Sequence, residues 1–237
     1  MTERFRDKVV LITGAASGIG EAAARRFASE GAALVLGDLN EEGLARVVKE
    51  IEESGGRAVG RALDVAERAQ VEELTEDAPR HFGGLDVMFN NAGIGAFGKT
   101  PDLDPEVWLR TFEVDVHSVF YGTRAAIPLL RERGGGAIVN TASISGLAGD
   151  YGLSAYNAAK GAVVNYTRAA AIEHAGENIR INAVCPGPVE TPLAHSLIHH
   201  PKVRDEYTKA IPMGRPGRAD EIAAAAAFLA GALDSRR

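Results

Sequence analysis

Cysteine is almost absent from this sequence of 237 residues, since Cys185 is the only one. No disulfide can therefore form within the chain, which is typical of proteins from a reducing compartment. The N-terminal segment MTERFRDKVV has no apolar core of the kind that a signal peptide requires, and no run reaches about 18 apolar residues. We therefore expect a cytoplasmic protein with no membrane partner.

Basic residues are outnumbered, because 26 Lys and Arg stand against 32 Asp and Glu and give a formal net charge of −6. Binding to the phosphates of nucleic acid needs a basic surface, so we expect no nucleic-acid partner. Three histidines, His195, His199 and His200, are crowded together, but no carboxylate or thiolate accompanies them at a ligand spacing. We therefore expect no metal site and interpret them as solvated side chains, with substrate contact as the alternative.

Short apolar runs alternate with longer amphipathic segments along the whole chain. The runs are continuous, which is typical of strands covered on both faces, as in a parallel sheet between helices. Strands are expected at 9–13, 33–37, 57–63, 85–90, 137–141 and 179–184, and helices at 20–30, 41–54, 67–82, 104–133, 155–175 and 219–230. The alternation predicts an α/β fold of the Rossmann type, a doubly wound parallel sheet with helices on both faces.

Nothing in the composition divides the chain. Hydrophobic residues make up 46% and charged residues 24%, as in an ordinary globular protein, and no linker or repeat occurs, so residues 1–237 are expected to form a single domain. The segment 191–213 is the most irregular and carries Pro192, Pro201 and Pro212. An excursion of about 20 residues in a compact domain is usually a lid or a short helical insertion, and we expect a substrate lid here.

The first predicted strand runs into a glycine-rich loop with the sequence TGAASGIG, and a helix follows. Gly14 would permit the tight turn, Gly18 would let the backbone approach a pyrophosphate, and Gly20 would let the helix pack against the sheet. The free N–H groups and the dipole at the start of the helix favour phosphate. This context predicts a dinucleotide-binding site.

Asp38 ends the second predicted strand, 18 residues after Gly20. A carboxylate at this place can accept hydrogen bonds from both hydroxyls of an adenosine ribose, and it would repel a 2′-phosphate. Positions 15–17 and 39–40 hold no Arg or Lys to offset that repulsion. We therefore predict NAD rather than NADP as the cofactor.

A tyrosine and a lysine lie four residues apart on the predicted helix 155–175, so Tyr156 and Lys160 share one face of it. A tyrosine hydroxyl ordinarily has a pKa of about 10, too high for a good base at neutral pH, and a nearby ammonium favours the ionised form. Ser143 follows the strand 137–141 at a carboxyl end, where ligands bind in open α/β sheets. We expect Tyr156 to exchange the proton, Lys160 to tune it and hold the cofactor ribose, and Ser143 to position the substrate oxygen.

Four motifs follow one another in a characteristic order. They are Thr13-Gly-x3-Gly-Ile-Gly, Asn90-Asn91-Ala92-Gly93, Ser143-x12-Tyr156-x3-Lys160 and Pro186-Gly187. In this order and spacing the sequence resembles the short-chain dehydrogenase/reductase family over nearly the whole chain. The resemblance implies an oxidoreductase in which a nicotinamide cofactor carries the hydride. Tyr151, the nearest rival of Tyr156, has no lysine four residues later.

The resemblance also implies contacts along the cofactor. Asp64 and Val65 would contact the adenine ring, and segment 91–93 would line the adenosine ribose side. The nicotinamide end would be held by Pro186, Gly187, Val189 and Thr191. Asn90 and Asn91 would also link the central strands. The candidate cofactor residues are Gly14, Ser17, Gly18, Ile19, Gly20, Asp38, Leu39, Asp64, Val65, Asn91, Ala92, Gly93, Tyr156, Lys160, Pro186, Gly187, Val189 and Thr191.

The sequence departs from the family at Asp115, where a catalytic asparagine is usual. The resemblance implies that the main chain at this position helps to hold a water molecule beside the active lysine, which an aspartate could preserve. The added carboxylate could instead bias Lys160 toward its charged form. We expect Asp115 to be a fourth catalytic residue, with activity retained and the pH profile altered.

A second departure concerns the last residues, Gly231-Ala-Leu-Asp-Ser-Arg-Arg237, where the family generally continues into one more strand near a DGG-type sequence. We expect the sheet to lack that strand and to have an exposed edge. The strand supports assembly in the family, so we predict a homo-oligomer but leave the choice between tetramer and dimer open.

The substrate pocket is expected to be mostly apolar and to lack an arginine pair for a carboxylate. Its expected residues are Ile94, Gly95, Ser145, Leu147, Tyr151, Leu153 and the lid segment 193–211. We therefore predict an NAD-dependent alcohol dehydrogenase or ketone reductase with a neutral or hydrophobic small-molecule substrate, of the 3-oxoacyl type or a cyclic alcohol, diol or ketone. The alternative is an NAD(H)-binding redox sensor of the same fold with impaired catalysis, which only Asp115 favours.

Overall fold

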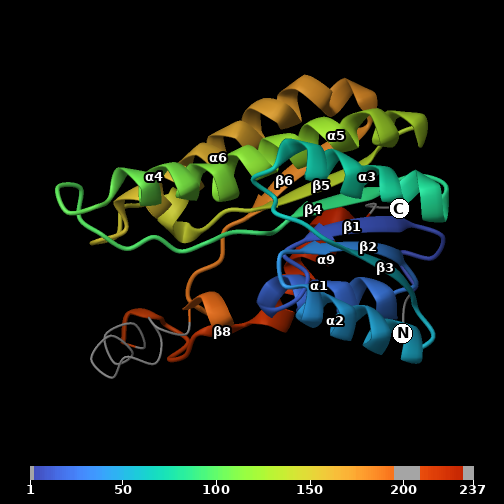
Figure 1. Cartoon of the computed structure of the whole chain (residues 1–237), viewed down its shortest axis with the longest axis horizontal. Coiled ribbons are helices and arrows are strands. Elements are labelled where there is room, and N and C mark those ends of the chain that lie inside the picture. Colours follow the sequence, from blue (N-terminus) through green and yellow to red (C-terminus); the bar gives the residue numbers. More distant parts are fainter. Residues whose placement is uncertain (1–2, 195–208, 232–237) are drawn as a thin grey trace.

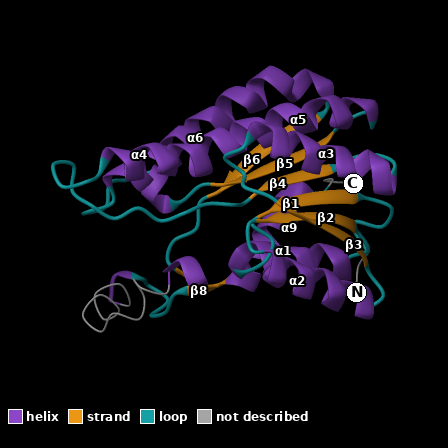
Figure 2. Ribbon diagram, viewed as in Figure 1, coloured by secondary structure: helices purple, strands orange, loops and turns teal. Residues whose placement is uncertain are grey.

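A six-stranded parallel sheet forms the centre of the protein in the computed structural model, which describes residues 3–194 and 209–231 (Figures 1 and 2). The strands are β1 (Val9–Thr13), β2 (Ala33–Asp38), β3 (Arg57–Ala62), β4 (Val87–Asn90), β5 (Gly136–Thr141) and β6 (Ile179–Val184). Their order is β3-β2-β1-β4-β5-β6, and every neighbouring pair is parallel. The strand order reverses between β1 and β4, which is where open sheets of this kind bind ligands.

Helices cover both faces of the sheet (Figure 1). Helices α1 (Gly18–Ser29), α2 (Glu41–Glu53) and α9 (Ala219–Ala230) lie on one face, and α3 (Arg68–Phe82), α5 (Ser118–Glu132) and α6 (Ser154–His174) lie on the other. Each helix layer packs on its own apolar cluster. Successive side chains of β1 point to opposite faces of the sheet, so Ile12 belongs to one cluster and Leu11 to the other. The predicted single-domain α/β fold with a doubly wound sheet is confirmed.

One predicted helix differs from its expectation. The segment 104–133 was expected as a single α-helix, and the structure has α4 (Pro105–Phe112), a π-helical turn (Glu113–His117) and then α5. Asp104 caps α4 by accepting the amide N–H of Glu106, and Pro105 occupies the first turn. A π-turn inside a helix is frequent at functional sites, and this one contains Asp115.

A second, short pair of parallel strands flanks the segment that was expected to form a lid. It joins β7 (Val189–Glu190) to β8 (Gly217–Arg218), and a 3₁₀ turn at Pro192–Ala194 follows β7. Two-residue strands have too little periodicity to be found in the sequence. Residues 195–208, which carry the three histidines, lie outside the described residues.

Strand β6 is one of the two edge strands of the sheet among the described residues, the other being β3. Arg180 of β6 donates hydrogen bonds to the carbonyls of Leu229, Ala230 and Gly231 at the end of α9. Residues 232–237 lie outside the described part, so the absence of a further strand stays a prediction. Within residues 3–194 and 209–231, no helix combines the length and apolar character that a membrane crossing requires.

Candidate active site

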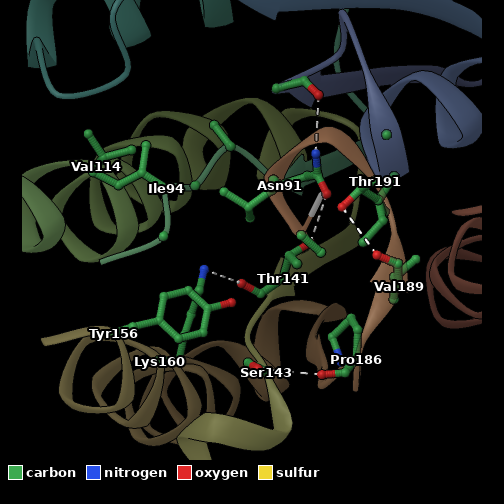
Figure 3. A pocket seen from close by; sticks show the side chains of 18 of the residues that line it. Asn91, Ile94, Val114, Thr141, Ser143, Tyr156, Lys160, Pro186, Val189 and Thr191 are labelled. Atoms are coloured by element: carbon green, nitrogen blue, oxygen red, sulfur yellow. Dashed lines mark hydrogen bonds between the residues drawn. The ribbon is translucent and has the colours of Figure 1, made fainter. Parts of the chain in front are cut away.

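A cavity of about 390 Å³ opens at the carboxyl ends of the strands (Figure 3). Of the candidate cofactor residues, all except Gly20 line it. The candidate catalytic residues Ser143, Tyr156 and Lys160 line it too, whereas Asp115 is not part of the lining and lies buried behind Lys160. The structure thus brings together residues that are up to 177 positions apart, from Gly14 to Thr191.

The glycine loop is shaped by conformations and contacts that only glycine permits. Gly14 and Gly18 have φ of +68° and +55°, and a Cβ on Gly14 would lie 2.8 Å from the Ala92 Cα. A Cβ on Gly20 would lie 1.9 Å from the Gly14 carbonyl oxygen, so Gly20 serves the packing of α1 beneath the loop rather than the cavity lining. Ser17 precedes α1 without a side-chain capping hydrogen bond. This bare helix N-terminus fits a dinucleotide pyrophosphate.

Asp38 is held against the glycine loop. Its Oδ2 accepts the Ala16 N–H at 2.9 Å, and its Oδ1 accepts the Asn40 N–H at 2.8 Å. A carboxylate offers about four acceptor positions, so two remain for ribose hydroxyls. A nearby cation that no sequence pattern indicates, Arg46, donates to the Ala16 carbonyl at 3.2 Å and pairs with Glu21 at 2.8 Å.

Asp64 lines the same cavity and has a partner that the sequence did not indicate. Arg110 of α4 donates to Asp64 Oδ2 at 2.6 Å, and the Ala66 N–H donates to Oδ1 at 3.0 Å. Burial acts to raise the pKa of the Asp64 carboxyl, but the hydrogen bonds from Ala66 and Arg110 outweigh it and lower that pKa. Arg110 also lines the cavity, and no local pattern could link it to a residue 46 positions away.

Asn90, the last residue of β4, and Asn91, which follows it, link the strands, as predicted. Asn90 donates to Asn140 Oδ1 on β5 at 2.9 Å. Asn91 donates to the Thr13 carbonyl on β1 at 3.1 Å and accepts from Thr141 Oγ1 on β5 at 3.2 Å. These bonds hold three strand ends in register at the floor of the cavity.

Tyr156 and Lys160 project from α6 into the cavity that Ser143 also lines, with Lys160 directed at Thr141 (Figure 3). Lys160 is 3% exposed, and its ammonium donates to the Thr141 carbonyl at 3.1 Å and lies 5.6 Å from the centre of the Tyr156 ring. Ser143 Oγ donates to the Pro186 carbonyl at 3.4 Å and accepts the Ser145 N–H at 3.1 Å. A hydroxyl, a phenol and an ammonium therefore face the same cavity, the set needed to hold an oxygen and move a proton.

Asp115 is completely buried in the π-turn. Its Oδ1 accepts the Ile94 N–H at 2.8 Å and lies 3.7 Å from Lys160 Nζ. Burial raises the pKa of the Asp115 carboxyl, and the charge of Lys160 acts in the opposite direction. The carboxyl expected to influence Lys160 therefore lies close to it.

The substrate end of the cavity is mainly apolar. Ile94, Gly95, Ser145 and Leu153 line it as predicted, whereas Leu147 and Tyr151 do not and are 59% and 86% exposed. Leu193 and Ala194, from the expected lid segment 193–211, line it too, and additional lining residues at this end are Phe97, Ile144, Asp150 and Pro188. Across the described ranges 3–194 and 209–231, no group of three or more His, Cys, Asp or Glu side chains could hold a metal ion.

Comparisons with known proteins agree with this geometry. Residues 14–236 match the family described as Enoyl-(Acyl carrier protein) reductase. The chain is 43% identical to meso-2,3-butanediol dehydrogenase of Serratia marcescens, over 96% of this chain and 88% of that protein. It is also 43% identical to cyclohexanol dehydrogenase of Acinetobacter sp. (strain SE19), over 97% and 90% respectively. The crystal structure of levodione reductase matches with a TM-score of 0.92 and 38% identity, over 96% of this chain and 92% of that one.

The fold and the similarity to these dehydrogenases and this reductase show that the protein is an oxidoreductase. The chain belongs to the short-chain dehydrogenase/reductase family, as its four motifs indicated. The family uses a nicotinamide cofactor, NAD or NADP, and the glycine loop and strand ends described above fit such a group.

Proposed function

We propose that the protein is an NAD-dependent dehydrogenase or reductase that interconverts a neutral secondary alcohol and its ketone. The observation that carries the proposal is the convergence of Ser143, Tyr156 and Lys160 on one cavity, beside a loop built for a dinucleotide. We also propose that the segment 191–213 acts as a lid over the substrate and that the chain works as a homo-oligomer.

Each of the three side chains has one role. Ser143 and Tyr156 bind the substrate oxygen through their hydroxyl groups. In oxidation, the ionised Tyr156 accepts the proton of the alcohol, and in reduction the Tyr156 hydroxyl returns a proton to the ketone oxygen. Lys160 stabilises the ionised form of Tyr156 with its charge and binds the cofactor ribose. A bound nicotinamide ring would accept or supply the hydride.

Asp38 supports NAD as the cofactor. Its carboxylate is fixed beside the loop by two backbone N–H groups, at the place where the adenosine ribose would lie. Arg46, the nearby cation, is paired with Glu21 and Glu50, so its charge is already compensated. A 2′-phosphate would meet a carboxylate there and no uncompensated arginine.

The lining of the substrate end supports a neutral, mostly apolar substrate. Phe97, Ile144 and Leu193 are 54%, 46% and 51% exposed around this end, and Asp150 is its acidic residue. An anionic substrate would meet Asp150 without an opposing arginine. The names of the relatives, which refer to butanediol and cyclohexanol, agree with small diols or cyclic alcohols as first candidates.

The test is a panel of secondary alcohols and ketones, including acyclic diols, cyclic alcohols and 3-oxoacyl thioesters, with the absorbance of the reduced nicotinamide as readout. Each substrate is assayed with NAD and with NADP. We expect turnover of neutral substrates with NAD and much weaker turnover of carboxylate-bearing analogues. Tight NADH binding without turnover of any substrate would contradict the proposal and favour the redox-sensor alternative.

A further inference from the structure

Asp115 has an unusual environment for a carboxyl group. It lies in the π-turn between α4 and α5 and has no exposed surface. Its Oδ1 accepts the Ile94 N–H, but its Oδ2 is buried and has no hydrogen-bond partner among residues 3–194 and 209–231. Most buried polar atoms are hydrogen-bonded, so an unpartnered carboxyl oxygen calls for a functional explanation.

The space around this carboxyl is shared with the active lysine. Lys160 Nζ lies 3.7 Å from Asp115 Oδ1 and donates its hydrogen bond to the Thr141 carbonyl instead. A Cβ on Gly93 would lie 2.7 Å from Asp115 Oδ1 and 3.2 Å from Lys160 Nζ, so only a glycine leaves room for both groups. The two groups therefore interact through charge at a buried, closely packed place, where such interactions are stronger than at the surface.

Two arginines on the neighbouring elements have carboxylate partners of their own. On α4, Arg110 binds Asp64 and Glu113, and on α5, Arg124 binds Glu72. Glu113 and His117 belong to the same π-turn, and α6 contributes Tyr156 beyond the lysine. Lys160 is thus the one cation within ion-pair distance of Asp115 in the part of the chain that the structure describes.

We propose that Asp115 is a positioning residue whose ionisation sets the pH range in which Tyr156, beside Lys160, accepts the proton of an alcohol that NAD oxidises. The inference rests on the proposed function. At low pH the buried carboxyl is neutral and leaves the ammonium charge fully available to the ionised tyrosine. As the pH rises the carboxyl loses its proton to solvent, and its negative charge offsets the ammonium. The ionisations of Asp115 and Tyr156 are therefore coupled. Alcohol oxidation then requires a higher pH than it would with an uncharged residue at position 115.

Replacing Asp115 with asparagine keeps the shape of the side chain and removes the charge. In Asp115→Asn we expect the acid limb of kcat/KM for alcohol oxidation to move to lower pH by about one unit, the scale of one added charge in a partly screened interior. The affinity for NADH and the rate at high pH should stay near the wild-type values. Glu113→Gln, which removes a half-exposed carboxylate from the same turn, is the matched control and should leave the profile unchanged. Coincident profiles for wild type and Asp115→Asn would overturn the inference.

A second measurement does not depend on turnover. Infrared spectra of the cofactor-free protein across pH should contain the carbonyl stretch of a buried, protonated carboxyl that disappears as the pH rises and is missing in Asp115→Asn. This band would be found even if no substrate were turned over, so failure of the proposed function and failure of this inference are distinguishable. If Asp115→Asn does not fold, Asp115→Ser serves the same comparison. A spectrum without a titrating carboxyl would refute the inference.

Discussion

The cofactor preference offers a prediction whose size can be worked out from the position of Asp38. Asp38→Asn removes one negative charge and keeps an acceptor for the Ala16 or Asn40 N–H. Two unit charges 4 Å apart interact by about 1 kcal/mol in water and about 4 kcal/mol at a partly buried site. Since 1.4 kcal/mol is a factor of ten, the preference for NAD over NADP should fall by about 5-fold to about 10³-fold.

The assay is the ratio of kcat/KM with NAD to kcat/KM with NADP, measured with one alcohol. Asp64→Asn is the matched control, because Asp64 also lines the adenosine end but is neutralised by Arg110. Asp64→Asn should weaken the binding of NAD and of NADP to a similar extent and leave the ratio of their kcat/KM values unchanged. The reasoning is refuted if the wild-type protein already uses NADP as efficiently as NAD, or if Asp38→Asn leaves the ratio where it was.

Two further predictions concern stability. Gly20→Ala would place a Cβ 1.9 Å from the Gly14 carbonyl oxygen and should lower the free energy of unfolding by about 1–3 kcal/mol in urea titrations, whereas Gly176→Ala, with open space around it, should cost far less. Asp86 is buried and accepts bonds from Lys8, Arg133 and the Val9 N–H. Burial acts to raise the pKa of the Asp86 carboxyl, but these hydrogen bonds outweigh burial and lower that pKa. The ionised carboxyl therefore stabilises the fold fully above the pKa of an ordinary aspartate, and this stabilisation is lost as the pH falls through the lowered pKa. Asp86→Asn should therefore flatten the acid limb of unfolding stability, and an unchanged limb would contradict this assignment.

The sheet and the cofactor loop could be predicted because their signals are local. A continuous apolar run such as Val9–Thr13 indicates a buried strand by itself, and three glycines in one loop indicate a turn that approaches a ligand. The candidate trio could be placed because Tyr156 and Lys160 are one helical turn apart and Ser143 follows a strand.

The remaining features depend on tertiary contacts. The π-turn at Asp115 interrupts a segment whose periodicity predicts an uninterrupted helix, since one extra residue per turn leaves no mark in the apolar pattern. Arg110 reaches Asp64, and Arg46 reaches the Ala16 carbonyl, across 46 and 30 positions of sequence. The prediction that Tyr151 lines the substrate pocket was wrong, because its side chain is exposed outside the cavity lining. The ammonium of Lys99 lies 5.0 Å from the centre of the Tyr151 ring.

The central claim is that Tyr156 moves the proton of the substrate hydroxyl. The most direct test compares wild type, Tyr156→Phe and Tyr151→Phe for NAD-dependent alcohol oxidation and, separately, for NADH affinity by fluorescence. Tyr151 is an exposed tyrosine outside the cavity lining, so its replacement controls for the loss of a hydroxyl. The account predicts that Tyr156→Phe loses turnover by a factor of at least about 10² while NADH still binds, and that Tyr151→Phe resembles wild type. Turnover retained in Tyr156→Phe would contradict it.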